Sequence, residues 1–375
     1  MRIRSVFATV LRYPDANDHG AWRLTVLSRV ETEDGVVGWG EGIAMWPEAC
    51  RATKLLIDEA FAPLLINAGE ITVAEAWRLM RGHCWWYGEG GIACFAYSAL
   101  DMALWDIEGK IQGKPLYKLF GGKVRESMPA YASIHVNKAT NAENIDEVVG
   151  FKKAGYRGVK LGFAKKGLSN IGRDPANDVV FVRDLRAAVG DDFEILVDAG
   201  HGVTWDLSAG INTVKRMAEY NIGWIEEPFY PSKIEAHRAL KAAVNVPVAM
   251  GEREFTVTDY ARLIETGVAD VLGVDPGRVE GISGFLRVDE LVGRAGLTIN
   301  AHAWSTAVTT AASLHLSLAS PNARLLELKP FPVSVQTELV DTPIVQRNGS
   351  IAALEGPGLG ITVNEELVRR LTLDA

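Results

Sequence analysis

Short apolar runs alternate with amphipathic segments from about residue 128 to residue 335 of the chain. The segments between the runs, such as NIDEVVGFKKAG and TDYARLIETG, place apolar residues three and four positions apart, which predicts helices. The repeated strand–helix unit predicts a closed parallel α/β barrel of the TIM type, (β/α)-barrel, with eight strands. The expected strands are 129–136, 158–163, 194–199, 223–228, 247–252, 270–275, 297–302 and 324–329.

An open, doubly wound parallel sheet uses the same alternation of strands and helices. When such a sheet binds a nucleotide, its first turn is normally rich in glycine. Neither GxGxxG nor GxxxxGK[ST] occurs in the chain, so the barrel is the preferred fold.

The first 127 residues show a different pattern. Three strand-like segments, RIRSVFATVL, WRLTVLSRVET and VVGWGEG, predict an antiparallel meander, and helical patterns follow it. We therefore expect an α+β domain over residues 1–127 and the barrel over 128–335. Residues 336–375 do not extend the barrel pattern, and we expect them to return to the first domain.

Composition and charge narrow the classes of function. Of the 375 residues, 48% are hydrophobic and 23% are charged, which is typical of a compact globular protein. The net charge is −8 and Lys and Arg are scattered, so nucleic acid is not an expected partner. No apolar stretch reaches the roughly 20 residues of a membrane-spanning helix. Cys50, Cys84 and Cys94 lack CxxC spacing, which indicates neither a disulfide framework nor a cysteine zinc site and fits the cytoplasm.

Candidate chemistry lies where the predicted strands end, because the active site of a parallel barrel forms on that face. Asp198, Glu226 and Glu252 end three successive strands, which lie only about 4.8 Å apart when they are neighbours. Each acid alone would more commonly be a helix cap or a surface ion pair. Three carboxylates gathered away from water require a neutralising cation, since burying each charge costs several kcal/mol. Oxygen ligands favour Mg²⁺, with Mn²⁺ as an alternative, over zinc.

The next two strands end in an acid and a histidine, Asp275 and His302. A carboxylate that accepts a hydrogen bond from one imidazole nitrogen raises the basicity of the other, which makes a competent general base. Ser305 follows His302, so a serine nucleophile is the alternative. No GxSxG motif occurs, and clustered acids would repel a developing oxyanion, so the general-base hypothesis is preferred.

Together these motifs resemble the mandelate racemase branch of the enolase superfamily over nearly the whole chain. SALDMALWDIEGKIQGKPLYKLFGG is similar to a helix with a Gly-Gly ending in that family's N-terminal capping domain. ILVDAG, WIEEP and MGE are similar to its metal motifs, which assigns Asp198, Glu226 and Glu252 as ligands of one Mg²⁺ per subunit and leaves Glu227 a structural role.

The resemblance also implies the reacting groups. The family's Asp–His dyad falls on Asp275 and His302, Glu327 matches an acid that can hydrogen-bond the substrate carboxylate, and Lys160 can assist. The shared chemistry is removal of the proton next to a carboxylate, which gives an enediolate stabilised by Mg²⁺.

One position departs from the family pattern. Many members carry Lys-x-Lys at the second strand, where this chain has Lys160, Leu161 and Gly162. A two-base racemase is therefore disfavoured unless Lys165, Lys166 or a capping-loop residue replaces the second lysine. A dehydratase can work with His302 alone if elimination is syn, whereas an anti course needs another acid.

These considerations predict a Mg²⁺-dependent acid-sugar dehydratase that forms a 2-keto-3-deoxy acid. The alternatives are a racemase, epimerase or lactone cycloisomerase that shares the enolisation step, and a catalytically silent sugar-acid binding protein. The expected partner is a small acid sugar, and the resemblance also implies a homo-oligomer. Candidates for substrate binding are His201, Arg278, His19, Trp46 and His83, each of which could equally pack a loop or the domain interface.

Overall fold

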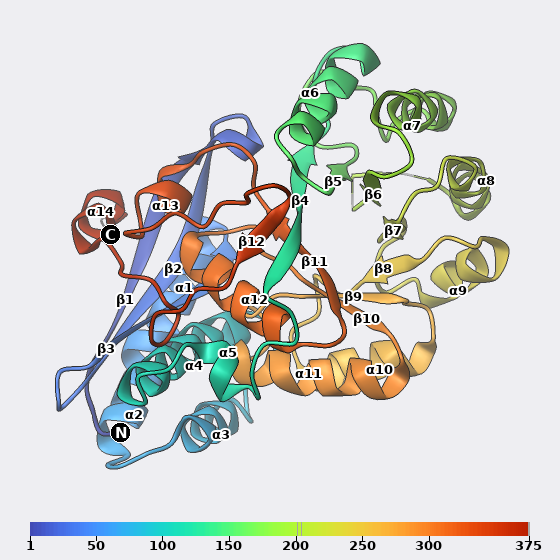
Figure 1. Ribbon diagram of the computed structural model, residues 1–375. Coiled ribbons are helices and arrows are strands. Elements are labelled where there is room, and N and C mark those ends of the chain that lie inside the picture. The colour runs from blue at the N-terminus through green and yellow to red at the C-terminus, as the bar shows by residue number, and fades with distance from the viewer. Residues whose placement is uncertain (201, 204, 374–375) are drawn as a thin grey trace.

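The computed structural model describes residues 1–200, 202–203 and 205–373. An N-terminal α+β domain lies against one side of a barrel (Figure 1). Its sheet has the order β1-β2-β3, and all pairings are antiparallel. The strands are β1 (Ile3–Asp15), β2 (Ala21–Thr32) and β3 (Val37–Met45).

Helices cover the sheet of this domain. The long helix α4 packs directly on β3, because Gly38, Gly40 and Gly42 leave room for its backbone. A Cβ atom at Gly40 would lie 1.9 Å from the carbonyl oxygen of Ala99. The elements between β1 and β2 and after β3 are η1 (Ala16–Asp18), α1 (Pro47–Leu55), the π-helical turn η2 (Leu56–Phe61), α2 (Ala62–Asn67), α3 (Val73–His83), α4 (Ile92–Ile111) and α5 (Leu116–Leu119).

The predicted barrel is confirmed. Eight parallel strands pair in chain order, and the last pairs with the first, β11 with β4, which closes the sheet. The strands are β4 (Ser127–His135), β5 (Gly158–Gly162), β6 (Glu194–Asp198), β7 (Trp224–Glu226), β8 (Val248–Met250), β9 (Val271–Val274), β10 (Thr298–Ala301) and β11 (Ala323–Leu328).

Helices connect successive barrel strands on the outside, as Figure 1 shows. They are α6 (Asn141–Lys153), α7 (Pro175–Val189), α8 (Leu207–Ala218), α9 (Ile234–Ala243), α10 (Val257–Thr266), α11 (Gly281–Ala295) and α12 (Ala307–Ala319). After β11 the regular alternation ends, since the next helix, α13 (Ser334–Thr337), is short and no further barrel strand follows it among the described residues. Pro330 and Pro332 precede this helix, and proline has no backbone N–H to donate to a helical hydrogen bond.

The C-terminal segment contacts both parts of the molecule. β12 (Ser350–Ala352) adds antiparallel to β4 on the barrel. Helix α14 (Glu365–Leu371) packs against β1, and the Leu373 N–H donates to Val10 O at 2.8 Å. The described residues of this segment, up to Leu373, therefore reach the N-terminal domain.

A buried carboxylate joins the two domains beside the barrel mouth. Glu41 on β3 is fully buried and accepts hydrogen bonds at 2.6 Å from the hydroxyls of Thr306 and Thr309, at the start of α12. The Ser305 hydroxyl also donates a hydrogen bond to Glu41. Glu41 and these three hydroxyl groups together form the domain anchor. The anchor fixes the segment that directly follows His302.

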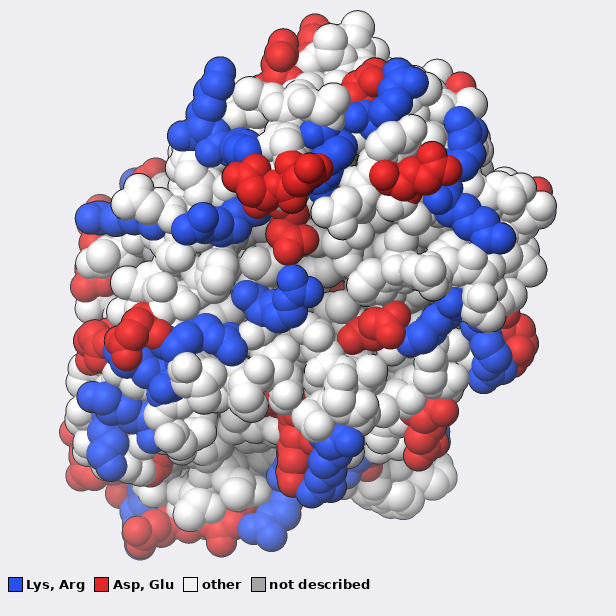
Figure 2. Space-filling view, turned by 45° about the vertical axis from the view of Figure 1, so that its right-hand side comes forward, with Lys and Arg blue, Asp and Glu red and all other residues white. Residues whose placement is uncertain are grey.

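The surface and helices agree with the composition. On the face in Figure 2, Lys and Arg side chains are interspersed with Asp and Glu side chains rather than collected in one basic area. Among the described residues, no helix has the length and apolar content needed to span a bilayer.

Candidate active site

A cavity of about 690 Å³ lies over the C-terminal ends of the barrel strands, between the barrel and the N-terminal domain. Strand register brings Gly162, Asp198 and Glu226 to one level, because each pairs with the next across the sheet. Several predicted residues line the cavity, namely Lys160, Asp198, Glu252, His302, Glu327, Arg278 and Trp46.

The strands are shorter than predicted at this end. Glu252, Asp275 and His302 lie just beyond β8, β9 and β10 in the loops that follow, while Glu327 lies within β11. The backbone leaves the sheet early at Gly251, whose φ of 117° favours glycine. The side chains nevertheless remain at the mouth of the barrel.

Lys160 is the central cation of the site. Its side chain is 4% exposed, and its Nζ lies 3.3 Å from Glu226 Oε1 and 3.1 Å from Glu327 Oε1. Burial acts to lower the pKa of Lys160, but Glu226 and Glu327 outweigh it and hold the pKa well above the usual range. Lys160 is therefore an ammonium group at neutral pH.

The three predicted metal ligands surround one region but are not tightly gathered. Their carboxylate oxygens do not all lie within 4.8 Å of one another. Among the described residues, the one group of His, Cys, Asp or Glu side chains that meets this distance is Asp18, His19 and His135. Glu226 is instead turned toward Lys160. Burial, together with the charges of Asp198 and Glu252, raises the pKa of Glu226 well above its usual range.

The donor set nevertheless fits a hard divalent cation. Asp198 Oδ1 is buried and has no hydrogen-bond partner among the described residues, so a lone pair remains available. All three ligand candidates supply carboxylate oxygens, the donors that Mg²⁺ prefers. Glu227, by contrast, accepts from Gly251 N at 3.2 Å and pairs with Arg253 at 3.0 Å, which ties it to the loop after β8.

The Asp275–His302 pair has the geometry of an oriented imidazole. Asp275 Oδ2 lies 2.6 Å from His302 Nδ1, and Asp275 Oδ1 accepts from Gly277 N at 2.7 Å. Because an ionised carboxylate only accepts, Nδ1 is the donor and Nε2 remains free to exchange a proton. Nε2 lies 3.9 Å from both Glu252 and Glu327.

Electrostatics increases the proton affinity of this imidazole. Burial acts to lower the pKa of His302, but the charges of Glu327 and Asp275 raise the pKa to about 9. Glu327 is held in place by the Ala303 N–H, which donates to its Oε2 at 2.9 Å. The dyad and Glu327 thus form one buried unit on one side of the cavity.

The substrate-binding candidates are placed unequally. Arg278 lies over the rings of Phe95 and Phe255, at 5.1 and 4.8 Å from their centroids, and no carboxylate of the described residues lies within ion-pair distance. Trp46 is 64% exposed at the cavity edge. His201 lies outside the described residues.

The structure does not bring His83 to this cavity. His83 ends α3 and packs edge-on against Phe61 and Tyr87, with ring centroids 6.2 and 6.1 Å away. His83 is therefore exposed on the N-terminal domain and does not line the cavity.

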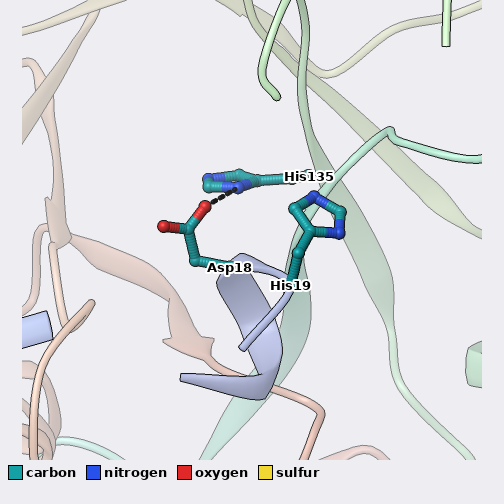
Figure 3. Close-up of side chains that lie close together, drawn as sticks. All are labelled: Asp18, His19 and His135. Carbon is teal, nitrogen blue, oxygen red and sulfur yellow. Dashed lines mark ion pairs between the residues drawn. The ribbon is translucent and has the colours of Figure 1, made fainter. Parts of the chain in front are cut away.

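His19 lies at the rim with two groups that the sequence analysis missed (Figure 3). His135 ends β4, with Nδ1 3.2 Å from Asp18 Oδ1, and its ring stacks on Trp304 at 5.2 Å. Asp18 also pairs with Arg23 at 2.7 Å. Burial acts to raise the pKa of Asp18, but His135 and Arg23 outweigh it and leave the pKa lowered. The strand-end position of His135 was a usable signal, whereas Asp18 comes from the other domain and gave none.

Comparison with known proteins places the chain in a family. Residues 143–367 match the enolase C-terminal domain-like model, and residues 21–121 match the mandelate racemase/muconate lactonizing enzyme N-terminal domain. A D-galactarolactone cycloisomerase from Agrobacterium fabrum is 29% identical over 92% of this chain and 90% of its own length. A D-galactonate dehydratase from Ralstonia pickettii is also 29% identical, over 91% of this chain and 89% of its own length.

A solved structure agrees over the full length. The crystal structure of a member of the enolase superfamily from Polaromonas sp. JS666 matches with a TM-score of 0.89 and 28% identity, and it covers 100% of this chain and 98% of that one. The two family models together span both domains. The chain therefore belongs to the enolase superfamily, in its mandelate racemase/muconate lactonizing enzyme family.

Proposed function

We propose that this protein is a Mg²⁺-dependent acid-sugar dehydratase that converts an aldonate or aldarate into a 2-keto-3-deoxy acid. The single observation that carries the proposal is the oriented dyad, with His302 Nδ1 held at 2.6 Å by Asp275 at the edge of the carboxylate-rich cavity. Relatives named as D-galactonate and arabinonate dehydratases support the substrate class.

The neutral imidazole is the general base in this proposal, and a cation held by Glu252 would oppose the carboxylate charges that raise the pKa of His302. Nε2 of His302 takes the proton next to the substrate carboxylate, and Asp275 stabilises the imidazolium that forms. Lys160 and Glu327 lie on the floor of the cavity, where the ammonium group attracts the substrate oxygens. Glu327 can donate a hydrogen bond to the substrate carboxylate once it has taken up a proton. The intermediate is an enediolate, which loses the β-hydroxyl.

Asp198, Glu226 and Glu252 would hold the cation. Mg²⁺, when bound, supplies Lewis-acid stabilisation of the negative charge on the substrate carboxylate. Glu226 would then turn from Lys160 toward the cation, and Glu327 would still hold Lys160 in the floor of the cavity. Chelation of the metal should abolish turnover, and titration calorimetry should show one Mg²⁺ per subunit.

A lactone cycloisomerase is the second candidate. The observation that favours it is the relative named D-galactarolactone cycloisomerase, which matches over 92% of this chain. The enolisation step and its residues are the same, and only the fate of the intermediate differs.

A library of aldonates, aldarates and their lactones, incubated with Mg²⁺, distinguishes the candidates. A dehydratase converts the open-chain acid into a 2-keto-3-deoxy acid with loss of water, detected as its semicarbazone and by mass, whereas a cycloisomerase converts the lactone into a product of unchanged mass. His302→Asn should abolish exchange of the α-proton with solvent deuterium. Retention of that exchange in His302→Asn would refute the assigned base, and absence of turnover with the whole library would leave a sugar-acid binding protein.

We also propose that the protein works as a cytoplasmic homo-oligomer. Cys50, Cys84 and Cys94 are all buried free thiols, which suits a reducing compartment. Trp85 and Trp86 are 73% and 80% exposed on the N-terminal domain, and association would cover such surface. Light scattering coupled to gel filtration measures the number of subunits.

A further inference from the structure

The glycine at the end of β5 leaves a space that another side chain uses. A Cβ atom at Gly162 would lie 3.0 Å from Lys165 Cε and 3.1 Å from His135 Cδ2. The chain turns back after β5, and the aliphatic part of Lys165 therefore passes directly over Gly162. Any side chain at this position would compete with Lys165 for the same volume.

The amino group of Lys165 ends inside the cavity. Its Nζ lies 3.7 Å from Asp198 Oδ2, and the side chain is 21% exposed. A Cβ atom at Gly200 would lie 3.1 Å from this Nζ, so a second glycine, with φ of 53°, also keeps the path clear. Lys165 is thus a loop lysine that can reach the active site because Gly162 and Gly200 have no side chains in its path.

Lys165 and His302 reach the cavity from different parts of the barrel. Lys165 follows β5 and His302 follows β10, and β11 and β4 separate these strands on the shorter path around the closed sheet. Both residues line the same cavity. A substrate between them has one proton-transferring group on each side.

Lys160 is less suited to deliver a proton to the substrate. Its Nζ is buried between Glu226 and Glu327, at 3.3 and 3.1 Å, and these carboxylates hold it in the floor. Lys165 has a single ion-pair partner within 4.0 Å among the described residues, and that partner is at 3.7 Å. Its ammonium group can therefore turn toward a substrate hydroxyl.

We propose that Lys165 is the general acid of the elimination, an inference that rests on the proposed dehydratase function. His302 takes the α-proton, and the C–H electron pair becomes part of the enediolate. The bond between the β-carbon and its hydroxyl oxygen then breaks, and the oxygen keeps the electron pair. The Lys165 ammonium group donates a proton to that oxygen, which leaves as water. The enol product tautomerises to the 2-keto acid, His302 gives its extra proton to solvent, and solvent reprotonates Lys165.

This role predicts a separation of two measurable steps. In D₂O, with D-galactonate or whichever library acid the wild type dehydrates, Lys165→Met should keep α-proton exchange while product formation falls by about 10²–10⁴. His302→Asn should lose both. Lys153→Met serves as the matched control, because Lys153 is an exposed lysine at the end of α6 and should leave both rates unchanged.

Chemical restoration of the amine tests the role independently. Lys165→Cys treated with bromoethylamine gains a side chain of nearly lysine length, and product formation should return to within about tenfold of the wild type. The native thiols of Cys50, Cys84 and Cys94 are fully buried and should stay unmodified.

A binding readout completes the test. Mass-spectrometric mapping should show that D-galactonate with Mg²⁺ protects Lys165, but not Lys153, from trinitrobenzenesulfonate. Dehydration by Lys165→Met at the wild-type rate, equal loss of exchange and dehydration, or labelling of Lys165 that ligand does not slow would each overturn the inference. Failure of the wild type to dehydrate any acid sugar would instead overturn the proposed function.

Discussion

Replacement of Asp275 by asparagine isolates the contribution of the dyad, because it preserves the side-chain volume and replaces one carboxylate oxygen with an NH₂ group. In the wild type, Asp275 Oδ1 accepts from Gly277 N at 2.7 Å and Oδ2 accepts from His302 Nδ1 at 2.6 Å. The asparagine oxygen can keep the bond from Gly277, and the NH₂ group then faces Nδ1. Nδ1 must now accept, so Nε2 carries the proton and cannot act as the base.

The expected loss follows from the change of tautomer. Loss of general-base catalysis lowers the rate by about 10²–10⁴, which is about 2.7–5.5 kcal/mol at 1.36 kcal/mol per factor of ten. Removing the Asp275 charge also removes one of the groups that raise the pKa of His302 to about 9; the neutral imidazole is then a weaker base but a more abundant one below pH 9, so these two consequences offset each other. We expect α-proton exchange to fall by about 10³.

Proton NMR in D₂O measures this exchange as the loss of the α-proton signal of the acid sugar. Asp275→Asn, His302→Asn and the double variant should show nearly the same residual rate, because residues that act as one unit are not additive. A thermal melt of each variant excludes unfolding as the cause. Exchange by Asp275→Asn within about fivefold of the wild type would refute the argument that Asp275 fixes the tautomer.

Three further outcomes follow from other parts of the molecule. Glu252→Gln should weaken Mg²⁺ binding at least about tenfold, measured by titration calorimetry, and unchanged affinity would remove Glu252 from the ligand set. Lys329→Met should destabilise the protein by about 3–5 kcal/mol in urea unfolding, because it leaves Asp15 buried without its partner at 2.6 Å; a loss below about 1 kcal/mol would contradict this. Burial lowers the pKa of His315 to about 4, so the neutral form is favoured in the fold and stability should decline as pH falls from about 6.5 to about 4, by at most about 3 kcal/mol. His315→Gln should flatten this part of the urea-midpoint profile, and an unaltered profile would exclude His315 as its source.

Local sequence was sufficient for the barrel and the residues at its strand ends. Alternating apolar strands and amphipathic helices are short-range patterns, and in a parallel barrel the end of each strand must lie on one face. Asp198, Glu226 and His302 were therefore predictable without knowledge of any long-range contact. His135 at the end of β4 was accessible by the same reasoning.

Contacts between segments far apart in the sequence were decided only in the tertiary structure. Asp18 ends η1 and His83 ends α3, each just before a loop of the N-terminal domain, yet only Asp18 lines the cavity. Loop composition does not encode the direction in which a docked domain presents each loop. Glu41 likewise anchors α12 across 265 residues of chain, from Glu41 to Thr306.

Gly162 and Lys165 separate what the sequence determines from what the tertiary structure decides. The sequence by itself determined that Gly162 has no side chain to act as a base. It also placed Lys160 near the C-terminal end of its strand, at the mouth of the barrel. Only the folded backbone decided that Lys165 returns over Gly162 to reach Asp198, with Nζ 3.7 Å away. The physical reason is that strand position follows from local hydrophobic periodicity, whereas the path of a loop side chain depends on the space that residues from other elements leave free.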